Sequence, residues 1–268
     1  MRTPFNDTLF RSMPIVGILR FFPRAQVEHL VPAVLEGGLV NLEVTLNSPG
    51  AADLIRLTRD LLGDRGNVGA GTVTSMEGLK LALDAGASFI VTPVILPDVI
   101  RACVDAGVPV LPGAMTPTEI FTAWSLGATM VKVFPADQLG PGHLRAVKAP
   151  FPEIPLMPTG GVTVETLPAF RDAGADAFGV GSPLFDPRQV AAGNWDWFRQ
   201  RACQFREAYL AKRGWLRSSL VTDFNTPRSS LGLCLAKSSS HPWVFTRESV
   251  APSQPQRPLT YPTSRSYL

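Results

Sequence analysis

A short apolar run followed by a longer amphipathic stretch recurs along the first 213 residues of the chain. Gly66, Gly86, Gly107 and Gly127 stand 20, 21 and 20 residues apart, at positions typical of residues that end a helix. This period suits one strand plus one helix. We count eight apolar runs, each rich in Val, Ile or Leu: PIVGIL, VNLEVTL, NVGAGTV, SFIVTP, VPVLPG, TMVKVF, IPLMPT and DAFGVG.

Eight consecutive strand and helix units predict an α/β fold, a (β/α)8 TIM barrel in which helices surround a closed parallel sheet. The alternative is an open, doubly wound sheet, whose nucleotide-binding members carry G-x-G-x-x-G between a strand and a helix. The nearest match, GAGT at residues 69–72, lacks the third glycine. Apolar residues at helical spacing predict helices over residues 27–35 and 198–209. We therefore expect one barrel domain over residues 1–213.

Residues 214–268 differ in composition from the rest of the chain. They contain 11 Ser, 6 Pro and 5 Thr, without the spacing of apolar residues that buries a helix face. This composition predicts a disordered tail; the alternative is that its apolar clusters at 231–236 and 243–245 pack on the barrel or form a short hairpin. The tail holds six basic and two acidic groups, which leaves 19 basic and 20 acidic groups in the barrel region. The net charge of +3 therefore gives no reason to expect a nucleic-acid partner.

The composition also predicts a soluble cytoplasmic protein without a membrane partner. Apolar runs stay far shorter than the ~20 residues of a membrane helix. The first 14 residues include Asp7 and lack the apolar segment of a signal peptide. Cys103, Cys203 and Cys234 are an odd number of cysteines at wide spacings, as expected in a reducing compartment.

Lys132 is the one lysine of five that falls inside an apolar run. If Met130 and Lys132 share a strand face, both point into the barrel, and Val131 and Val133 point toward the helices. Burial would lower the pKa of the lysine and supply the neutral amine that attacks a carbonyl to form a Schiff base. The alternative is a long side chain that reaches out of the barrel mouth or pairs with a carboxylate.

Glu43 is the one carboxylate embedded in an apolar run, the second, and we expect its side chain to face inward. A buried carboxyl with a raised pKa can move protons while a Schiff base forms and breaks down. The alternative is a structural ion pair with Arg20 or Lys132. A pair with Lys132 would raise the pKa of the lysine and oppose its nucleophilic role.

Glycines follow the last two predicted strands, in PTGGV at residues 158–162 and GVGS at residues 179–182. Exposed backbone N–H groups after the seventh and eighth strands of a barrel commonly bind phosphate. The two motifs together predict a phosphate site. His29, His143 and His241 fall in a predicted helix, a loop and the tail, away from strand ends with carboxylates, so we expect no metal and no other cofactor.

Seven motifs carry a family resemblance: EVTLNSP (43–49), GAGTV (69–73), VTP (91–93), PGAMTPTE (112–119), KVFPA (132–136), PTGGV (158–162) and GVGS (179–182). Over residues 14–211 the chain resembles the 2-keto-3-deoxy-6-phosphogluconate/6-phosphogalactonate aldolase family. The resemblance implies a metal-independent class I aldolase, a lyase of Entner-Doudoroff type. Lys132 would form the Schiff base with the C2 ketone and Glu43 would transfer protons, releasing pyruvate and glyceraldehyde 3-phosphate. It also implies a homotrimer.

The resemblance further assigns residues to the substrate pocket. It implies that Arg20, Thr72 and Thr159 contact the acid end and the hydroxyls of the substrate. It implies that Pro93 and Phe134 form the wall of the pocket next to the pyruvate part. The phosphate would bind at Gly160, Gly161, Gly181 and Ser182. Asn47, where gluconate-type members typically carry arginine, and Arg20 within ILR resemble the galactonate-type branch, whereas Thr159 is the gluconate-type residue. Residues 21–23, Phe-Phe-Pro, replace the more open loop expected after the first strand.

We therefore expect the substrate to be 2-dehydro-3-deoxy-6-phosphogalactonate, with some activity on its C4 epimer, because only a site that hydrogen-bonds the C4 hydroxyl discriminates strongly. The alternatives within the family are 2-dehydro-3-deoxy-6-phosphogluconate and 4-hydroxy-2-oxoglutarate. Outside it, a phosphate-binding isomerase or a thiazole- or thiamine-type synthase would use the same glycines without needing Lys132. A noncatalytic sugar-phosphate-binding protein would use residues 214–268 for partners.

Overall fold

The computed structural model describes residues 4–211; the predicted tail lies outside these residues. Each of the eight apolar runs contains one strand, and the strands form one parallel sheet in the order β7-β6-β5-β4-β3-β2-β1-β8. A bridge between Thr159 and Gly179 joins the two edge strands and closes the sheet into a barrel, as predicted. The strands are β1 (Ile15–Leu19), β2 (Asn41–Thr45), β3 (Asn67–Gly71), β4 (Phe89–Thr92), β5 (Val110–Ala114), β6 (Val131–Val133), β7 (Leu156–Pro158) and β8 (Phe178–Val180).

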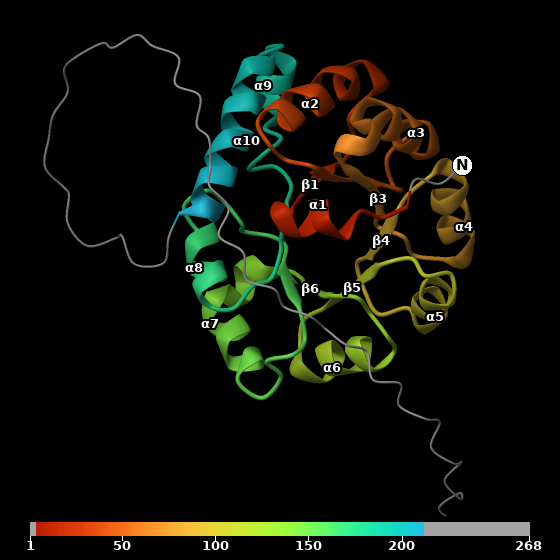
Figure 1. Ribbon diagram of the computed structural model, residues 1–268, viewed down its shortest axis with the longest axis vertical. Helices are drawn as coiled ribbons and strands as arrows, with labels where there is room; N and C mark the ends of the chain where they lie inside the picture. Colours follow the sequence, from red (N-terminus) through yellow and green to blue (C-terminus); the bar gives the residue numbers. More distant parts are fainter. Residues whose placement is uncertain (1–3, 212–268) are drawn as a thin grey trace, which may run out of the picture. The chain divides into compact units, whose positions relative to one another are not determined.

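Helices connect the strands and form a ring around the barrel (Figure 1). The predictions over residues 27–35 and 198–209 are confirmed by α2 and α10. No helix in the described part of the chain is long and apolar enough to cross a membrane. The surrounding helices are α2 (Arg24–Glu36), α3 (Ala51–Leu62), α4 (Met76–Ala85), α5 (Pro97–Asp105), α6 (Pro117–Ser125), α7 (Ala136–Lys148), α8 (Leu167–Asp172), α9 (Pro187–Ala191) and α10 (Trp195–Leu210).

Most of the glycines expected to end helices do so. Gly86, Gly107 and Gly127 follow α4, α5 and α6 with φ angles of 100°, 61° and 95°, in the left-handed region that glycine adopts at little cost. The prediction for Gly66 was wrong. Gly63 follows α3 with φ 54° and is the first residue of the short 3-10 helix η1 (Gly63–Arg65). Gly66 follows η1, and its backbone is extended.

A helix not expected from the sequence, α1 (Asp7–Ser12), precedes the first strand. The Asn6 side chain accepts a hydrogen bond from the Leu9 N–H and caps its first turn. Figure 1 shows α1 across the centre of the barrel. Its Phe10 packs in the barrel interior with Phe89, Met130 and Met157. The amino-terminal ends of the strands are therefore covered by an apolar side chain.

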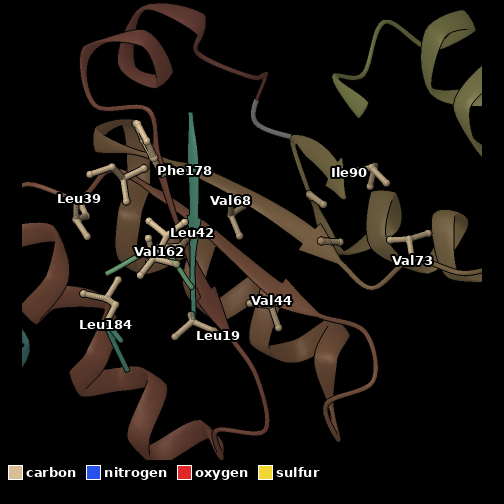
Figure 2. Close-up of a cluster of buried hydrophobic side chains, with 14 of the residues drawn as sticks. Leu19, Leu39, Leu42, Val44, Val68, Val73, Ile90, Val162, Phe178 and Leu184 are labelled. Atoms are coloured by element: carbon tan, nitrogen blue, oxygen red, sulfur yellow. The ribbon is translucent and has the colours of Figure 1, made fainter. Parts of the chain in front are cut away.

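Alternation along the strands sorts their side chains into two cores. Val16, Val91 and Met157 belong to the interior cluster, whereas their neighbours Ile15 and Ile90 pack outward against the helices. Figure 2 shows part of this outer core, to which the first four strands contribute. Full burial of one such Leu or Ile contributes about 1.5–3 kcal/mol. The outer core holds the sheet in place, so that inward-facing side chains at the carboxyl ends of the strands are left for the site.

Candidate active site

Lys132 lies in the middle of β6 and is 5% exposed. Val131 and Val133 pack in the outer core, and Met130 packs in the interior cluster. The alternation predicted from the sequence is therefore confirmed, and Lys132 points into the barrel. Its Nζ lies 5.0 Å from the centroid of the Phe134 ring. Among the described residues, Lys132 forms no ion pair.

Glu43 lies in β2 and is 1% exposed. Its carboxylate lies against Gly71 at the end of β3, where a Cβ atom would overlap the carboxylate and stand 2.8 Å from the carboxyl carbon. Glycine at position 71 thus makes the space that Glu43 occupies. Within residues 4–211, Oε2 of Glu43 is buried without a hydrogen-bond partner. A buried carboxylate oxygen without a partner is costly, and such atoms are typical of sites that act on a ligand.

Burial shifts the pKa values of Glu43 and Lys132 in the directions that favour the neutral form of each group. Desolvation raises the pKa of Glu43, and the positive charges of Lys132 and Arg20 partly oppose this shift. Desolvation likewise lowers the pKa of Lys132; the Glu43 charge opposes that shift and the Arg20 charge adds to it. Glu43 forms no ion pair with Arg20 or Lys132, so the structural ion pair considered above is absent from the described residues.

A cavity of about 570 Å³ opens at the carboxyl ends of the strands. The ring of Phe134 lines it, and Nζ of Lys132 lies 5.0 Å from the centroid of that ring, but neither Lys132 nor Glu43 is itself part of the lining. Ile18, the register partner of Glu43 on β1, lines it as well. The structure gathers seven of the predicted pocket residues in this lining: Arg20, Phe134, Thr159, Gly160, Gly161, Gly181 and Ser182.

Three predicted pocket residues do not line the cavity. Asn47 is exposed in the loop after β2. Thr72 follows β3 with a φ of 56°, which is rare for a residue with a side chain, and Pro93 follows β4 with its carbonyl group against Gly113. All three stand at the carboxyl ends of their strands, as a barrel active site requires. Their contacts with substrate stay predictions.

The glycine-rich end of the cavity presents unused hydrogen-bond donors. Gly160 and Gly161 adopt left-handed φ angles of 94° and 71° after β7. The backbone N–H groups of Gly161 and Ser182 donate no hydrogen bond to any described residue. Two open N–H groups in one lining fit the oxygens of a phosphate group.

Thr159 brings a further unpartnered atom to the same cavity. It is buried at the end of β7, and within residues 4–211 its hydroxyl has no hydrogen-bond partner. A Cβ at Gly179 would overlap this hydroxyl, so the glycine leaves room for it. A substrate hydroxyl is a fitting partner for such a group.

Sequence reasoning missed part of the lining. Its apolar wall consists of residues that only the fold brings together: Ile18, Phe21, Phe22, Val162, Pro183, Phe185 and Pro187. The one feature of the sequence that could have indicated these residues is their position, because most of them come directly after β1, β7 or β8.

A (β/α)8 barrel with a buried lysine and a buried carboxyl on its strands, and a cavity at the carboxyl ends of the strands, is the arrangement expected of a Schiff-base aldolase. The family model for KDPG and KHG aldolase matches residues 7–200. The chain belongs to this family, and it is accordingly an aldolase, a lyase.

Individual relatives agree with this assignment. The chain is 37% identical over 199 residues to 2-dehydro-3-deoxy-6-phosphogalactonate aldolase of Escherichia coli, covering 74% of this chain and 95% of that one. It is 35% identical to 2-dehydro-3-deoxy-phosphogluconate aldolase of Pseudomonas aeruginosa, covering 72% and 88%. A solved structure described as native KDPGal has a TM-score of 0.69 and 36% identity, covering 78% and 97% of the two chains.

Proposed function

We propose that this enzyme is a class I aldolase that cleaves 2-dehydro-3-deoxy-6-phosphogalactonate to pyruvate and glyceraldehyde 3-phosphate through a Schiff base on Lys132. The observation that carries the proposal is the environment of Lys132. Its amine is buried, its pKa is lowered by desolvation, and no described carboxylate forms an ion pair with it. These conditions shift the protonation equilibrium of Lys132 toward the neutral, nucleophilic amine.

The reaction follows from the two buried groups. The Lys132 amine adds to the C2 ketone, and loss of water gives a protonated imine. The C3–C4 bond then breaks: its electron pair moves toward the imine nitrogen to form an enamine, and the C4 hydroxyl loses its proton as the aldehyde forms. Protonation of the enamine at C3 and addition of water at C2 release pyruvate and restore the amine. Glu43, whose raised pKa suits both proton uptake and release, moves these protons directly or through water.

The rest of the cavity fits the two charged ends of such a substrate. Arg20 is the one charged side chain in the lining that the described residues form, and a guanidinium binds carboxylate well. The open amides of Gly161 and Ser182 supply neutral donors for the phosphate. Neither end requires a metal ion or a cofactor.

The preferred C4 epimer depends on polar groups near the middle of the cavity. The names of the relatives at 37% and 34% identity refer to the galactonate substrate, and Asn47 agrees with it. The buried hydroxyl of Thr159 instead favours some activity on 2-dehydro-3-deoxy-6-phosphogluconate. We expect kcat/KM to be larger for the galactonate epimer, and Thr159→Val to lower the rate on the gluconate epimer more. A larger kcat/KM for the gluconate epimer would reverse the assignment.

Trapping with borohydride tests the covalent step. Incubation with pyruvate and sodium borohydride should add one reduced pyruvate to the intact protein, and peptide mass mapping should place it on Lys132. Lys132→Ala should abolish the adduct. Lys80→Ala is the matched control because the Lys80 side chain is largely exposed on α4 and pairs with Asp84. No adduct on the intact protein would refute the Schiff base and favour a phosphate-binding isomerase or synthase.

We further propose that the enzyme works as a homotrimer in the cytoplasm. Exposed apolar side chains on the described barrel support self-association: Met76, Leu81, Val94, Val104, Met115 and Phe121. The odd number of widely spaced cysteines supports a reducing compartment. Sedimentation should give three times the mass of one chain; a monomer at micromolar concentration would contradict the trimer.

We also propose that residues 1–213 contain the whole catalytic domain. Every residue assigned a role above lies within this range. Deletion of residues 214–268 should leave turnover unchanged. A large loss of turnover or of the oligomer would assign the tail a role and strengthen the sugar-phosphate-binding alternative.

A further inference from the structure

We propose that Thr45 and Ser48 are positioning residues, whose hydroxyl groups clamp Arg20 at the cavity and thereby set the affinity for the anionic substrate. The inference rests on the function proposed above. Both hydroxyls belong to the end of β2 and the loop after it, the same strand that carries Glu43. They connect that strand to the turn that carries Arg20.

A relay of hydrogen bonds holds the backbone on both sides of Arg20. The Phe21 N–H donates to Oγ of Ser48 at 2.9 Å. The Ser48 and Thr45 hydroxyls lie 3.0 Å apart, and the Thr45 hydroxyl donates to the Leu19 carbonyl at 3.4 Å. Since Thr45 donates to Leu19, Ser48 must donate to Thr45. Each hydroxyl then donates once and accepts once.

The clamp holds a backbone conformation that the chain would otherwise avoid. Phe21 has a φ of 60°, in the left-handed region that is rare for residues with a bulky side chain. The residue is 59% exposed, so burial of its side chain offsets little of the strain. Strained residues of this kind persist where surrounding contacts determine them, and they cluster at functional sites. Here the contact is the bond from the Phe21 N–H to Ser48, and Ser48 itself is buried.

The hydrogen-bond relay affects function through Arg20, because it fixes the backbone on both sides of this residue. It lines the cavity and forms no ion pair with any described residue. Without a carboxylate to hold it, the direction of its side chain depends on its backbone. If Phe21 relaxed to a negative φ, Arg20 would turn with it and the cavity would lose the alignment of its positive charge.

Ser48→Ala tests the proposal directly. We expect KM for the phosphorylated substrate to rise about tenfold, the size expected for loss of one hydrogen bond. We expect kcat to change by less than about threefold, because Lys132 and Glu43 keep their places. Pyruvate and borohydride should still label Lys132, which separates failure of this proposal from failure of the proposed reaction. Thr45→Val breaks the relay at its other link with nearly unchanged volume and should give the same pattern if Ser48→Ala folds poorly.

Two variants of Phe21, each combined with Ser48→Ala, show whether Ser48 acts by holding the strained backbone at Phe21 or only by a general effect on the structure. Phe21→Gly removes the strain, because glycine adopts a positive φ at little cost, whereas Phe21→Ala removes the ring and keeps the strain. Adding Ser48→Ala should raise KM about tenfold in the Phe21→Ala background but less than about threefold in the Phe21→Gly background. An unchanged KM in both Ser48→Ala and Thr45→Val, or an equal rise in the two backgrounds, would overturn the proposal.

Discussion

Replacing Gly71 by alanine tests whether the exact position of the Glu43 carboxylate matters. An alanine Cβ there would overlap the carboxylate and stand 2.8 Å from its carboxyl carbon, against about 3.4–4 Å for ordinary contact between carbon atoms. Gly71 does not have a positive φ, so alanine brings no backbone strain. The clash involves the flexible end of a side chain, so the fold survives while the carboxylate retreats by about 1 Å.

A displacement of that size is expected to lower kcat by about 10²-fold, because a proton-transferring group works only within hydrogen-bond reach. Steady-state turnover measures the effect, and borohydride trapping reports separately on Lys132. We expect slower cleavage with Lys132 still able to form the adduct.

Gly142→Ala is the matched control. A Cβ at this glycine of α7 would meet no atom within 4 Å, and the residue lies away from the cavity. Its turnover should equal that of the parent, with the melting temperature equal or slightly higher. Parental kcat in a folded Gly71→Ala variant would refute the view that the carboxylate must occupy this place.

Other changes at the buried pair have equally definite outcomes. Glu43→Gln should lower turnover by roughly 10²-fold or more, and near-parental turnover would mean that another group moves the proton. Lys132→Arg should be as inactive as Lys132→Ala in the borohydride and turnover assays, because a guanidinium stays charged. Burial holds the pKa of Lys132 below its usual value, so the unfolded chain binds the proton more readily and stability rises with pH between the two pKa values. Lys132→Met should therefore melt at a higher temperature near pH 7, with the gain shrinking toward pH ~10.4, and a gain that is constant with pH would contradict this origin.

Local patterns were sufficient to predict the barrel and its two buried ionisable side chains, Lys132 and Glu43. Met130, Lys132 and the flanking valines alternate in a single short strand, so their faces could be assigned from periodicity. The α1 helix was missed because six residues are too few to show an amphipathic repeat. Gly66 was misassigned because two glycines close together, Gly63 and Gly66, can each end a helix, and only packing against neighbouring strands selects between them.

Contacts between distant segments account for what the sequence did not predict at the site. Ser48 is an ordinary loop serine until the fold places its hydroxyl next to the Phe21 amide, 27 residues away. The same holds for Gly71, whose missing side chain is understood only once Glu43 from the neighbouring strand fills the space. Such roles depend on pairs of residues, and a single sequence shows no pairing.

The apolar filling beneath Lys132 has a kinetic consequence. Phe10, Phe89, Met130 and Met157 pack the interior from the amino-terminal end, so within residues 4–211 reactants and products share the mouth at the carboxyl ends of the strands. In the proposed reaction the aldehyde fragment lies nearer that mouth, and the pyruvate fragment stays bonded to Lys132 until water adds. Release is then ordered, with the aldehyde first. Pyruvate should accordingly inhibit competitively against the phosphorylated substrate, and glyceraldehyde 3-phosphate should give mixed inhibition.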